Sequence, residues 1–300
     1  MSSEYATVAV AARELKGQAV SQKIQDDIKS EIDQWISQGI TVPHLSVILV
    51  GNDPASQVYV GHKARMCKQL GFTSEVIELP EMITQDELIK KIEDLNNNQD
   101  VDGILVQLPL PVHIHERTVL ETITPLKDVD CLTQTNIGAL VVGDSLIKPC
   151  TPAGIIEIFK FYNIALSGKK VAVIGRSLIV GTPLVHLLTQ ENATVTLFHS
   201  KSENLLQEIK QFDIVCVAIG KSEFFKITDF KKGSVLIDVG IHRSVGSSVL
   251  TGDVQKHVDS ADEALWLNAK TPVPGGVGPT TIALLMKNTF AVAKVRRGLS

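Results

Sequence analysis

The residues with the clearest potential for binding chemistry lie in the turn after residues 171–174, a short apolar run. Gly175, Arg176, Ser177 and Gly181 form this turn, and an apolar helical pattern begins near Gly181. A tight turn between a strand and a helix leaves the first helical N–H groups without partners in the helix, so a phosphate can bind there. The spacing GRSxxxG differs from the GxGxxG of dinucleotide-binding turns, and an ordinary strand-to-helix turn remains the alternative.

A lysine and a tyrosine could act on a substrate. Ser56, Tyr59 and Lys63 are three and four residues apart, so they share one face of the helix predicted for residues 54–70. Taken alone, such a pair is more typical of a half-buried ring and a solvated ammonium group than of a catalytic site. The neighbouring elements must therefore decide.

Polar residues also follow a predicted strand at residues 101–108. Gln107 lies at the carboxyl end of this strand, the edge at which open α/β sheets bind ligands. The turn PLKDVDC comes soon afterwards and carries two carboxylates, Asp128 and Asp130. A surface glutamine and a solvated acidic turn are the alternatives.

The residues after the strand predicted for 194–198 indicate which dinucleotide would bind. NAD-binding sites of this architecture usually carry Asp or Glu at this point, to hold the ribose 2′-hydroxyl. Here the chain has His199, Ser200 and Lys201, and Arg176 stands in the preceding turn. Cations and a hydroxyl favour a 2′-phosphate, so the pattern predicts NADP rather than NAD.

The elements that must position these residues alternate along the chain. Helices are predicted for residues 15–39, 54–70, 84–98, 151–162, 181–188, 204–210 and 282–295, and strands for 45–50, 101–108, 171–174, 194–198, 213–219 and 234–239. This alternation predicts an α/β protein with a doubly wound parallel sheet in its second half. The segment KTPVPGGVGPTT, residues 270–281, lies between the last predicted strand and the last predicted helix. Its glycines and prolines indicate backbone close to a ligand.

Length and composition limit the class of protein. Three hundred residues, 44% apolar and 21% charged, suit two globular domains. A net charge of −4 without a basic run disfavours a nucleic-acid partner. The four cysteines form no CxxC pair, so we expect reduced thiols and no metal site. No leader or membrane-spanning pattern is present, which predicts a cytoplasmic protein.

The order and spacing of nine short segments resemble the bifunctional methylenetetrahydrofolate dehydrogenase and methenyltetrahydrofolate cyclohydrolase family. The resemblance covers essentially the whole chain. The segments are SxxYVxxK (residues 56–63), GILVQLPLP (103–111), KDVD (127–130), KPCTPAG (148–154), GRSxxVGxP (175–183), HSKS (199–202), DVGI (238–241), GDV (252–254) and PVPGGVGP (272–279).

This resemblance implies two domains around a cleft. Residues 1–148 would form an α/β folate-binding domain completed by the C-terminal helix, residues 282–300, and residues 149–281 a Rossmann-like NADP-binding domain. It further implies a cytoplasmic homodimer that pairs through the cofactor domains, takes tetrahydrofolate derivatives as substrates and serves one-carbon metabolism and purine biosynthesis.

The resemblance also implies roles for individual residues. Lys63 would be the catalytic lysine, Gln107 would hydrogen-bond it, Tyr59 would pack on the folate and Asp130 would hold the pterin. Further binding residues are implied on both sides of the reaction. Pro272 and Gly276 would line the folate pocket, and Gly175, Arg176, Ser177, Ser200, Ile241, Gly276 and Val277 would contact NADP.

Two positions depart from the family pattern. Cys131 stands where the family usually has Gly after KDVD, and Thr280 stands where Met usually follows PGGVGP. If the backbone at 131 has positive φ, the cysteine costs about 1 kcal/mol and could displace Asp130. The competing hypotheses are an NAD-dependent dehydrogenase with weak cyclohydrolase activity and a folate-binding protein without catalysis.

Overall fold

The computed structural model describes residues 12–243, 249–256 and 264–299. The chain divides into two compact units. Met1–Gln18 and Ile155–Gly278 form one, which we call the six-stranded unit, and Ala19–Gly154 and Pro279–Ser300 form the other, the three-stranded unit. The prediction that the N-terminal segment is not a leader peptide concerns residues that mostly lie outside the described ranges.

The three-stranded unit is built on a parallel sheet with the strand order β3-β2-β4. Its strands are β2 (His44–Val50), β3 (Thr73–Leu79) and β4 (Gly103–Val106). Helix α2 (Pro54–Leu70) connects β2 to β3, and α3 (Gln85–Asn97) connects β3 to β4. This is the strand-helix alternation that the sequence predicts, with β3 as an additional strand that it did not reveal.

Local sequence signals fix both helices. The Asp53 side chain accepts a hydrogen bond from the Ser56 N–H (2.7 Å) and Pro54 begins α2. Gly71, at φ +85°, ends the same helix in the left-handed conformation. Thr84 and Glu87 form the predicted capping box of α3.

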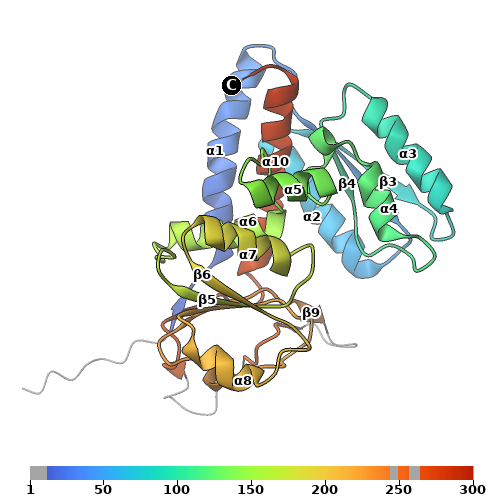
Figure 1. The fold of residues 1–300 in the computed structure, drawn as a ribbon. Coiled ribbons are helices and arrows are strands. Elements are labelled where there is room, and N and C mark those ends of the chain that lie inside the picture. The colour runs from blue at the N-terminus through green and yellow to red at the C-terminus, as the bar shows by residue number, and fades with distance from the viewer. Residues whose placement is uncertain (1–11, 244–248, 257–263, 300) are drawn as a thin grey trace, which may run out of the picture. The chain divides into compact units, whose positions relative to one another are not determined.

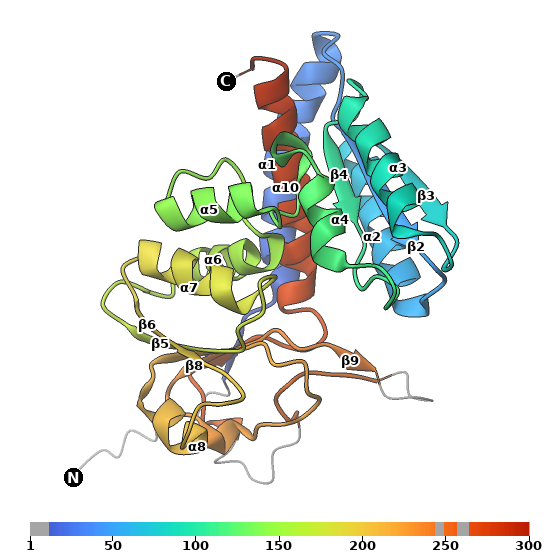
Figure 2. The same cartoon turned by 45° about the vertical axis from the view of Figure 1, so that its right-hand side comes forward.

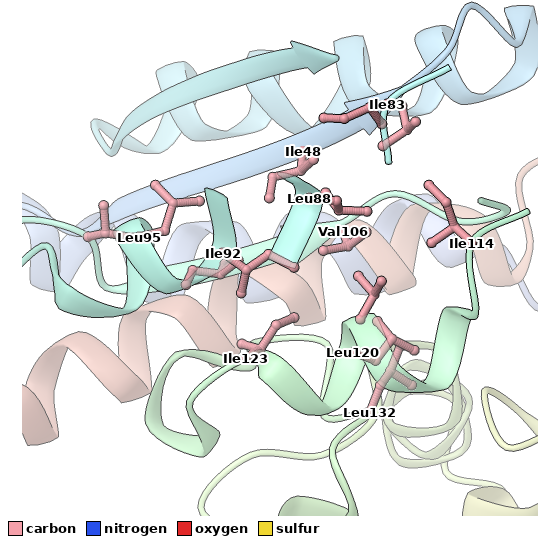
Figure 3. Packing of buried hydrophobic residues seen from close by; sticks show 14 residues of the cluster. Ile48, Ile83, Leu88, Ile92, Leu95, Val106, Ile114, Leu120, Ile123 and Leu132 are labelled. Carbon is pink, nitrogen blue, oxygen red and sulfur yellow. The ribbon is translucent and has the colours of Figure 1, made fainter. Parts of the chain in front are cut away.

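One face of this sheet packs against α3 and α4 (Glu116–Thr122), as Figure 3 shows. Alternate residues of β2, Ile48 and Val50, point into this core. The core also takes residues from the two helices and the following loops. They include Leu88, Ile92, Leu95, Val119, Leu120, Ile123 and Leu132.

Helices α1 (Gly17–Ser37) and α10 (Val277–Arg296) lie side by side in the three-stranded unit (Figures 1 and 2). The rings of Trp35 and Phe290 pack with centroids 5.0 Å apart, and Lys294 pairs with Glu31. At the end of α10, Arg297 forms two hydrogen bonds with the buried Asp102 carboxylate, at 2.7 and 2.8 Å. These contacts hold the C-terminal helix in this unit.

The six-stranded unit has an entirely parallel sheet in the order β1-β11-β8-β7-β5-β6. Helices α6 (Cys150–Phe161) and α7 (Gly181–Gln190) lie on one face and α8 (Leu205–Glu208) on the other (Figures 1 and 2). The predicted doubly wound sheet is therefore confirmed. Its strands are β1 (Arg13–Glu14), β5 (Lys170–Ile174), β6 (Thr194–Phe198), β7 (Ile214–Val217), β8 (Val235–Asp238) and β11 (Ala269–Lys270).

The start of the chain differs from the predicted assignment of residues 1–148 to the first domain. Strand β1 pairs with β11, and the Leu15 N–H donates to the Lys270 carbonyl (2.8 Å). Leu15 is fully buried there. A strand of two residues carries no sequence periodicity, and its partner lies far away in sequence, so this pairing could not be predicted.

Helix α10 also begins earlier than the predicted residue 282. It starts at Val277, so Pro279 lies in the first helical turn. A proline is tolerated there, because the N–H groups of the first turn have no partner within the helix. The Gly and Pro cluster therefore continues directly into the helix.

The remaining elements within the described residues are short. They are α5 (Gln134–Val142), the antiparallel pair β9 (His242–Arg243) and β10 (Leu250–Thr251), and the 3₁₀ helices η1 (Pro125–Lys127), η2 (Ile209–Gln211) and η3 (Ile227–Asp229). All four cysteines are buried and unpaired, as predicted. Among the described residues, no helix has the length and apolar character needed to cross a membrane.

Candidate active site

Lys63 and Gln107 come together in the three-stranded unit. Lys63 lies on α2, and its Nζ donates to Gln107 Oε1 at 2.9 Å. The Gln107 amide nitrogen donates to the Leu108 carbonyl (2.6 Å). This second bond fixes the amide orientation, so that the carbonyl oxygen of Gln107 is the atom facing the lysine.

Burial changes the proton affinity of Lys63. Loss of solvent lowers its pKa below the usual value, and the negative charge of Asp130 acts in the opposite direction. An amine with a lowered pKa is neutral in a larger fraction of molecules at a given pH. Lys63 is thereby suited to accept a proton, which the sequence alone could not establish.

The turn that carries Asp130 is anchored at two buried charges. Lys127 Nζ donates to the carbonyls of Leu95, Asn96 and Asn98 at 2.6 to 2.9 Å, which caps the end of α3. Burial lowers the pKa of Lys127 to about 8.

Asp128 anchors the other side of this turn. Its carboxylate accepts from the N–H groups of Leu132 (3.1 Å) and Thr133 (2.8 Å) and from the Asn136 amide (2.9 Å). Burial raises the pKa of Asp128. A solvated acidic turn, the alternative considered from the sequence, is therefore wrong for Asp128, which is 1% exposed.

Cys131 adopts the left-handed conformation, with φ +60°. This is the geometry for which a glycine would be preferred, so the expected backbone cost is present. The thiol is fully buried, and its Sγ lies 3.6 Å from the Ile147 carbonyl oxygen. With Cys131 in this conformation, the negative charge of Asp130 lies near enough to Lys63 to favour the protonated amine and so raise its pKa.

A second buried thiol, Cys150, lies beside the same carboxylate. Burial and the charge of Asp130 raise the pKa of Cys150. The Asn288 amide from α10 donates to the carbonyls of Val129 and Lys148, both at 2.8 Å. These bonds join α10 to the Asp130 turn and to the backbone just before α6.

Tyr59 lies on α2 one helical turn before Lys63 and is half-buried. The two side chains therefore share a helix face as predicted from their spacing. The predicted packing of the ring against folate remains a prediction.

The predicted phosphate-binding turn lies at the carboxyl end of β5, in the six-stranded unit. Gly175 has φ +118°, and a side chain at Gly181 would overlap the Gly175 carbonyl oxygen. Helix α7 has no side-chain cap at its first turn. Ser177 Oγ accepts from the Val180 N–H (3.2 Å), which leaves the hydroxyl of Ser177 as a donor. The tight turn and the Ser177 hydroxyl at the start of a helix fit a dinucleotide phosphate.

The adjacent strand brings the predicted 2′-phosphate residues to the same edge. Ile174 on β5 is paired with Phe198 on β6. Arg176 and Ser200 each follow this pair by two residues, and both are exposed. The arrangement places a guanidinium and a hydroxyl at neighbouring strand ends.

The other predicted binding residues also belong to the six-stranded unit. Pro272 and Gly276 follow β11, and a side chain at Gly276 would lie 2.6 Å from the Pro272 carbonyl oxygen. Val277 is buried at the start of α10, and Ile241 is 39% exposed beside β9. Their contacts with folate or NADP remain predictions.

Two buried acids in this unit escaped the sequence analysis. Asp238 ends β8 and Asp253 follows β10, and both accept several backbone hydrogen bonds. The segments DVGI and GDV contained them, but only the tertiary structure shows what they bind. No group of three or more His, Cys, Asp or Glu residues suited to a metal ion occurs in the part of the chain that the structure describes.

Two family models match the chain. The tetrahydrofolate dehydrogenase/cyclohydrolase catalytic domain matches residues 15–130, and the NAD(P)-binding domain of the same family matches residues 149–297. The Bifunctional protein FolD of Acetivibrio thermocellus is 47% identical over 285 residues, which are 95% of this chain and 98% of that protein.

Solved structures of the same family are also similar to this chain. The FolD methylenetetrahydrofolate dehydrogenase/cyclohydrolase of Campylobacter jejuni is 42% identical with a TM-score of 0.89, covering 95% of this chain and 100% of that one. The Trypanosoma brucei enzyme, solved with NADP and an inhibitor, is 34% identical with a TM-score of 0.88, covering 95% and 98%. Both the matched domains and the shared fold extend over nearly all of the chain, which therefore belongs to the tetrahydrofolate dehydrogenase/cyclohydrolase family.

Proposed function

We propose that this protein oxidises 5,10-methylenetetrahydrofolate with NADP and hydrolyses the resulting 5,10-methenyltetrahydrofolate to 10-formyltetrahydrofolate. The observation that carries the proposal is the Lys63–Gln107 hydrogen bond together with the lowered pKa of Lys63. Family membership supplies the reaction class, and this pair supplies a group able to act in its proton-transfer step.

The oxidation requires positioning more than acid or base chemistry. The methylene carbon lies between two nitrogens whose lone pairs stabilise the cation formed in the reaction. NADP, when bound, would supply the acceptor for the hydride that leaves this carbon. The protein contributes by holding the two reactants in contact, which can supply much of the rate enhancement.

The hydrolysis requires a base. Water attacks the methenyl carbon and must lose a proton, and neutral Lys63 accepts that proton at Nζ. The bond between this carbon and N5 then breaks, and the remaining hydroxyl proton passes to N5, which leaves the formyl group on N10. Gln107 Oε1 accepts a hydrogen bond from Nζ and so orients the amine. The positive charge of the methenyl substrate further disfavours protonated Lys63.

Substrate binding is assigned to two more residues of the three-stranded unit. Asp130 accepts hydrogen bonds from the pterin amino and ring N–H groups, and Tyr59 packs against the folate. The anchors Lys127 and Asp128 support this assignment, because they fix the turn on both sides of Asp130. Family resemblance also assigns Pro272 and Gly276 to folate binding.

Cofactor binding is assigned to the carboxyl edge of the six-stranded sheet. The turn of Gly175 and Ser177 receives the diphosphate, and Arg176 and Ser200 bind the 2′-phosphate. The exposure of both side chains at neighbouring strand ends supports this assignment. Ile241, Gly276 and Val277 contact the remainder of the cofactor.

A direct assay tests the proposed function. The purified protein is mixed with 5,10-methylenetetrahydrofolate and either NADP or NAD, and reduced cofactor and methenyl folate are followed by absorbance. Reduced NADP without lasting methenyl folate supports both activities. Accumulating methenyl folate contradicts the cyclohydrolase half, and absence of turnover with both cofactors contradicts the proposal.

The proposal extends to a cytoplasmic homodimer that provides one-carbon units for purine biosynthesis. Family resemblance supports this part. Sedimentation velocity tests the oligomeric state, and a monomer at micromolar concentration contradicts it.

A further inference from the structure

Two buried carboxylates in the six-stranded unit have no role in the chemistry described above. Asp238 is 5% exposed and Asp253 is fully buried. A buried carboxylate is costly unless hydrogen-bond donors surround it. The donors that surround these two aspartates show what they hold in place.

Asp253 binds three consecutive backbone N–H groups. They belong to Ile219 (2.7 Å), Gly220 (3.2 Å) and Lys221 (2.9 Å), the loop that follows β7. His242 Nε2 lies 2.7 Å from the same carboxylate. The conformation of residues 219–221 therefore depends on a single side chain that lies more than thirty residues later in the sequence.

Asp238 fixes Asp253 in turn. Its carboxylate accepts from the N–H groups of Gly240, Asp253 and Val254, each at 3.0 Å. A side chain at Gly252 would overlap the Asp238 carboxylate, so the backbone reaches it only because residue 252 is glycine. The two aspartates thus join the ends of β7, β8 and β10.

The loop held by Asp253 adjoins the turn assigned to the cofactor phosphates. Strands β5 and β7 are neighbours, and the Ala218 N–H donates to the Ile174 carbonyl at 2.8 Å. A side chain at Gly175 would overlap the Ala218 carbonyl oxygen. Because β6 lies on the other side of β5, the carboxyl ends of β5 and β7 mark the point where the strand order reverses, at which such sheets bind ligands.

We propose that Asp253, supported by Asp238 and His242, is a positioning residue that fixes residues 219–221 for NADP binding. The inference rests on the proposed cofactor site at the turn of Gly175. Asp253 acts through the backbone of residues 219–221 and not by contact with the cofactor. It holds the backbone of residues 219–221, after β7, in place beside the phosphate-binding turn that follows β5.

The test uses the two activities as mutual controls, because hydrolysis of methenyltetrahydrofolate needs no NADP. Asp253→Asn keeps the size of the side chain but replaces one acceptor oxygen by a donor, so at least one loop N–H loses its partner. We expect the KM for NADP to rise about tenfold, with a smaller change in kcat. Cyclohydrolase activity on methenyltetrahydrofolate should stay within about twofold of wild type.

Asp213→Asn is the matched control. Asp213 precedes β7 at the amino-terminal ends of the strands, away from the cofactor site. There its carboxylate accepts from the Lys170 N–H (3.1 Å) and pairs with Lys231. This variant should leave the KM for NADP unchanged. An equal rise in both variants would contradict the inference, as would an unchanged KM in folded Asp253→Asn or an equal loss of both activities.

If Asp253→Asn fails to fold, His242→Ala decides. It removes a single hydrogen bond from the carboxylate, and a raised KM for NADP at an unchanged melting temperature supports the inference. An unchanged KM contradicts it. Wild-type protein without NADP-dependent turnover would instead contradict the proposed function, and NADPH fluorescence would then still compare cofactor binding between wild type and variant.

Discussion

Lys63 donates a 2.9 Å hydrogen bond to Gln107, and the amide of Gln107 is itself fixed by the Leu108 carbonyl. A residue on a helix and a residue after a strand thus form one unit that can hold and release a proton. The hydrogen bond sets the position of the amine, and burial lowers its pKa.

Gln107→Glu should shift the pH dependence of the cyclohydrolase reaction. A carboxylate beside Nζ favours the protonated amine, so the limb on which activity rises with pH moves to higher pH. We expect the rate at pH 7 to fall about tenfold or more, as measured by methenyltetrahydrofolate decay between pH 6 and 10. Gln57→Glu, an exposed position on the same helix, should leave the profile unchanged. An unshifted profile in Gln107→Glu would show that Gln107 does not tune the lysine.

Arg176→Ala should affect NADP far more than NAD. The lost guanidinium is assigned to the 2′-phosphate, which NAD lacks, and a charged hydrogen bond of this kind corresponds to about a tenfold to hundredfold rise in KM. Steady-state dehydrogenase assays with both cofactors provide the comparison. Lys169→Ala serves as the control, because it removes an exposed cation at the other end of β5, the strand that Arg176 follows. Equal effects on both cofactors would assign Arg176 another role.

At position 131, glycine should be more favourable than alanine. Both substitutions lose the buried thiol. At φ +60° the Cβ of alanine strains the left-handed backbone, whereas glycine adopts this conformation without strain. We expect Cys131→Gly to exceed Cys131→Ala in unfolding free energy by about 1 kcal/mol, as measured in urea. The reverse order, which is usual in helices and strands, would mean that the conformation at residue 131 carries no strain.

Asp238 should make stability depend on pH in the acidic range. Burial raises its pKa from 3.8 to about 6, so the folded state binds a proton more tightly than the unfolded state. Its contribution to stability is therefore greatest below about pH 4 and is lost as the pH rises to about 6, with a total of about 3 kcal/mol. Urea unfolding at several pH values measures the difference in unfolding free energy between wild type and Asp238→Asn, which should change with pH over this range. A constant difference between the two proteins would contradict the predicted titration.

Local signals predicted much of the fold. The cap at Asp53 and Pro54, the capping box of Thr84 and Glu87, and the apolar run of β5 depend on neighbours within a few residues, and all three were confirmed. Strand β3 escaped prediction because it lies at the sheet edge, with mostly exposed side chains and no apolar alternation.

The chemistry was harder to predict than the fold. The types and spacing of Tyr59 and Lys63 were visible, but whether the lysine lies half-buried beside Gln107 depends on the packing of α2 against the sheet. Asp253 was out of reach for the same reason. Its carboxylate binds residues 219–221, which are remote in sequence, and no local pattern distinguishes such an acid from one in a solvated turn.

The most direct test of Lys63 as the base in hydrolysis is the cyclohydrolase rate of Lys63→Met. Methionine retains most of the buried length of the side chain but cannot accept a proton, so hydrolysis of methenyltetrahydrofolate should be abolished while NADP binding stays intact. Lys68→Met, at an exposed position on the same helix, should retain both properties. Cyclohydrolase activity near the wild-type rate in Lys63→Met would show that Lys63 is not the proton acceptor.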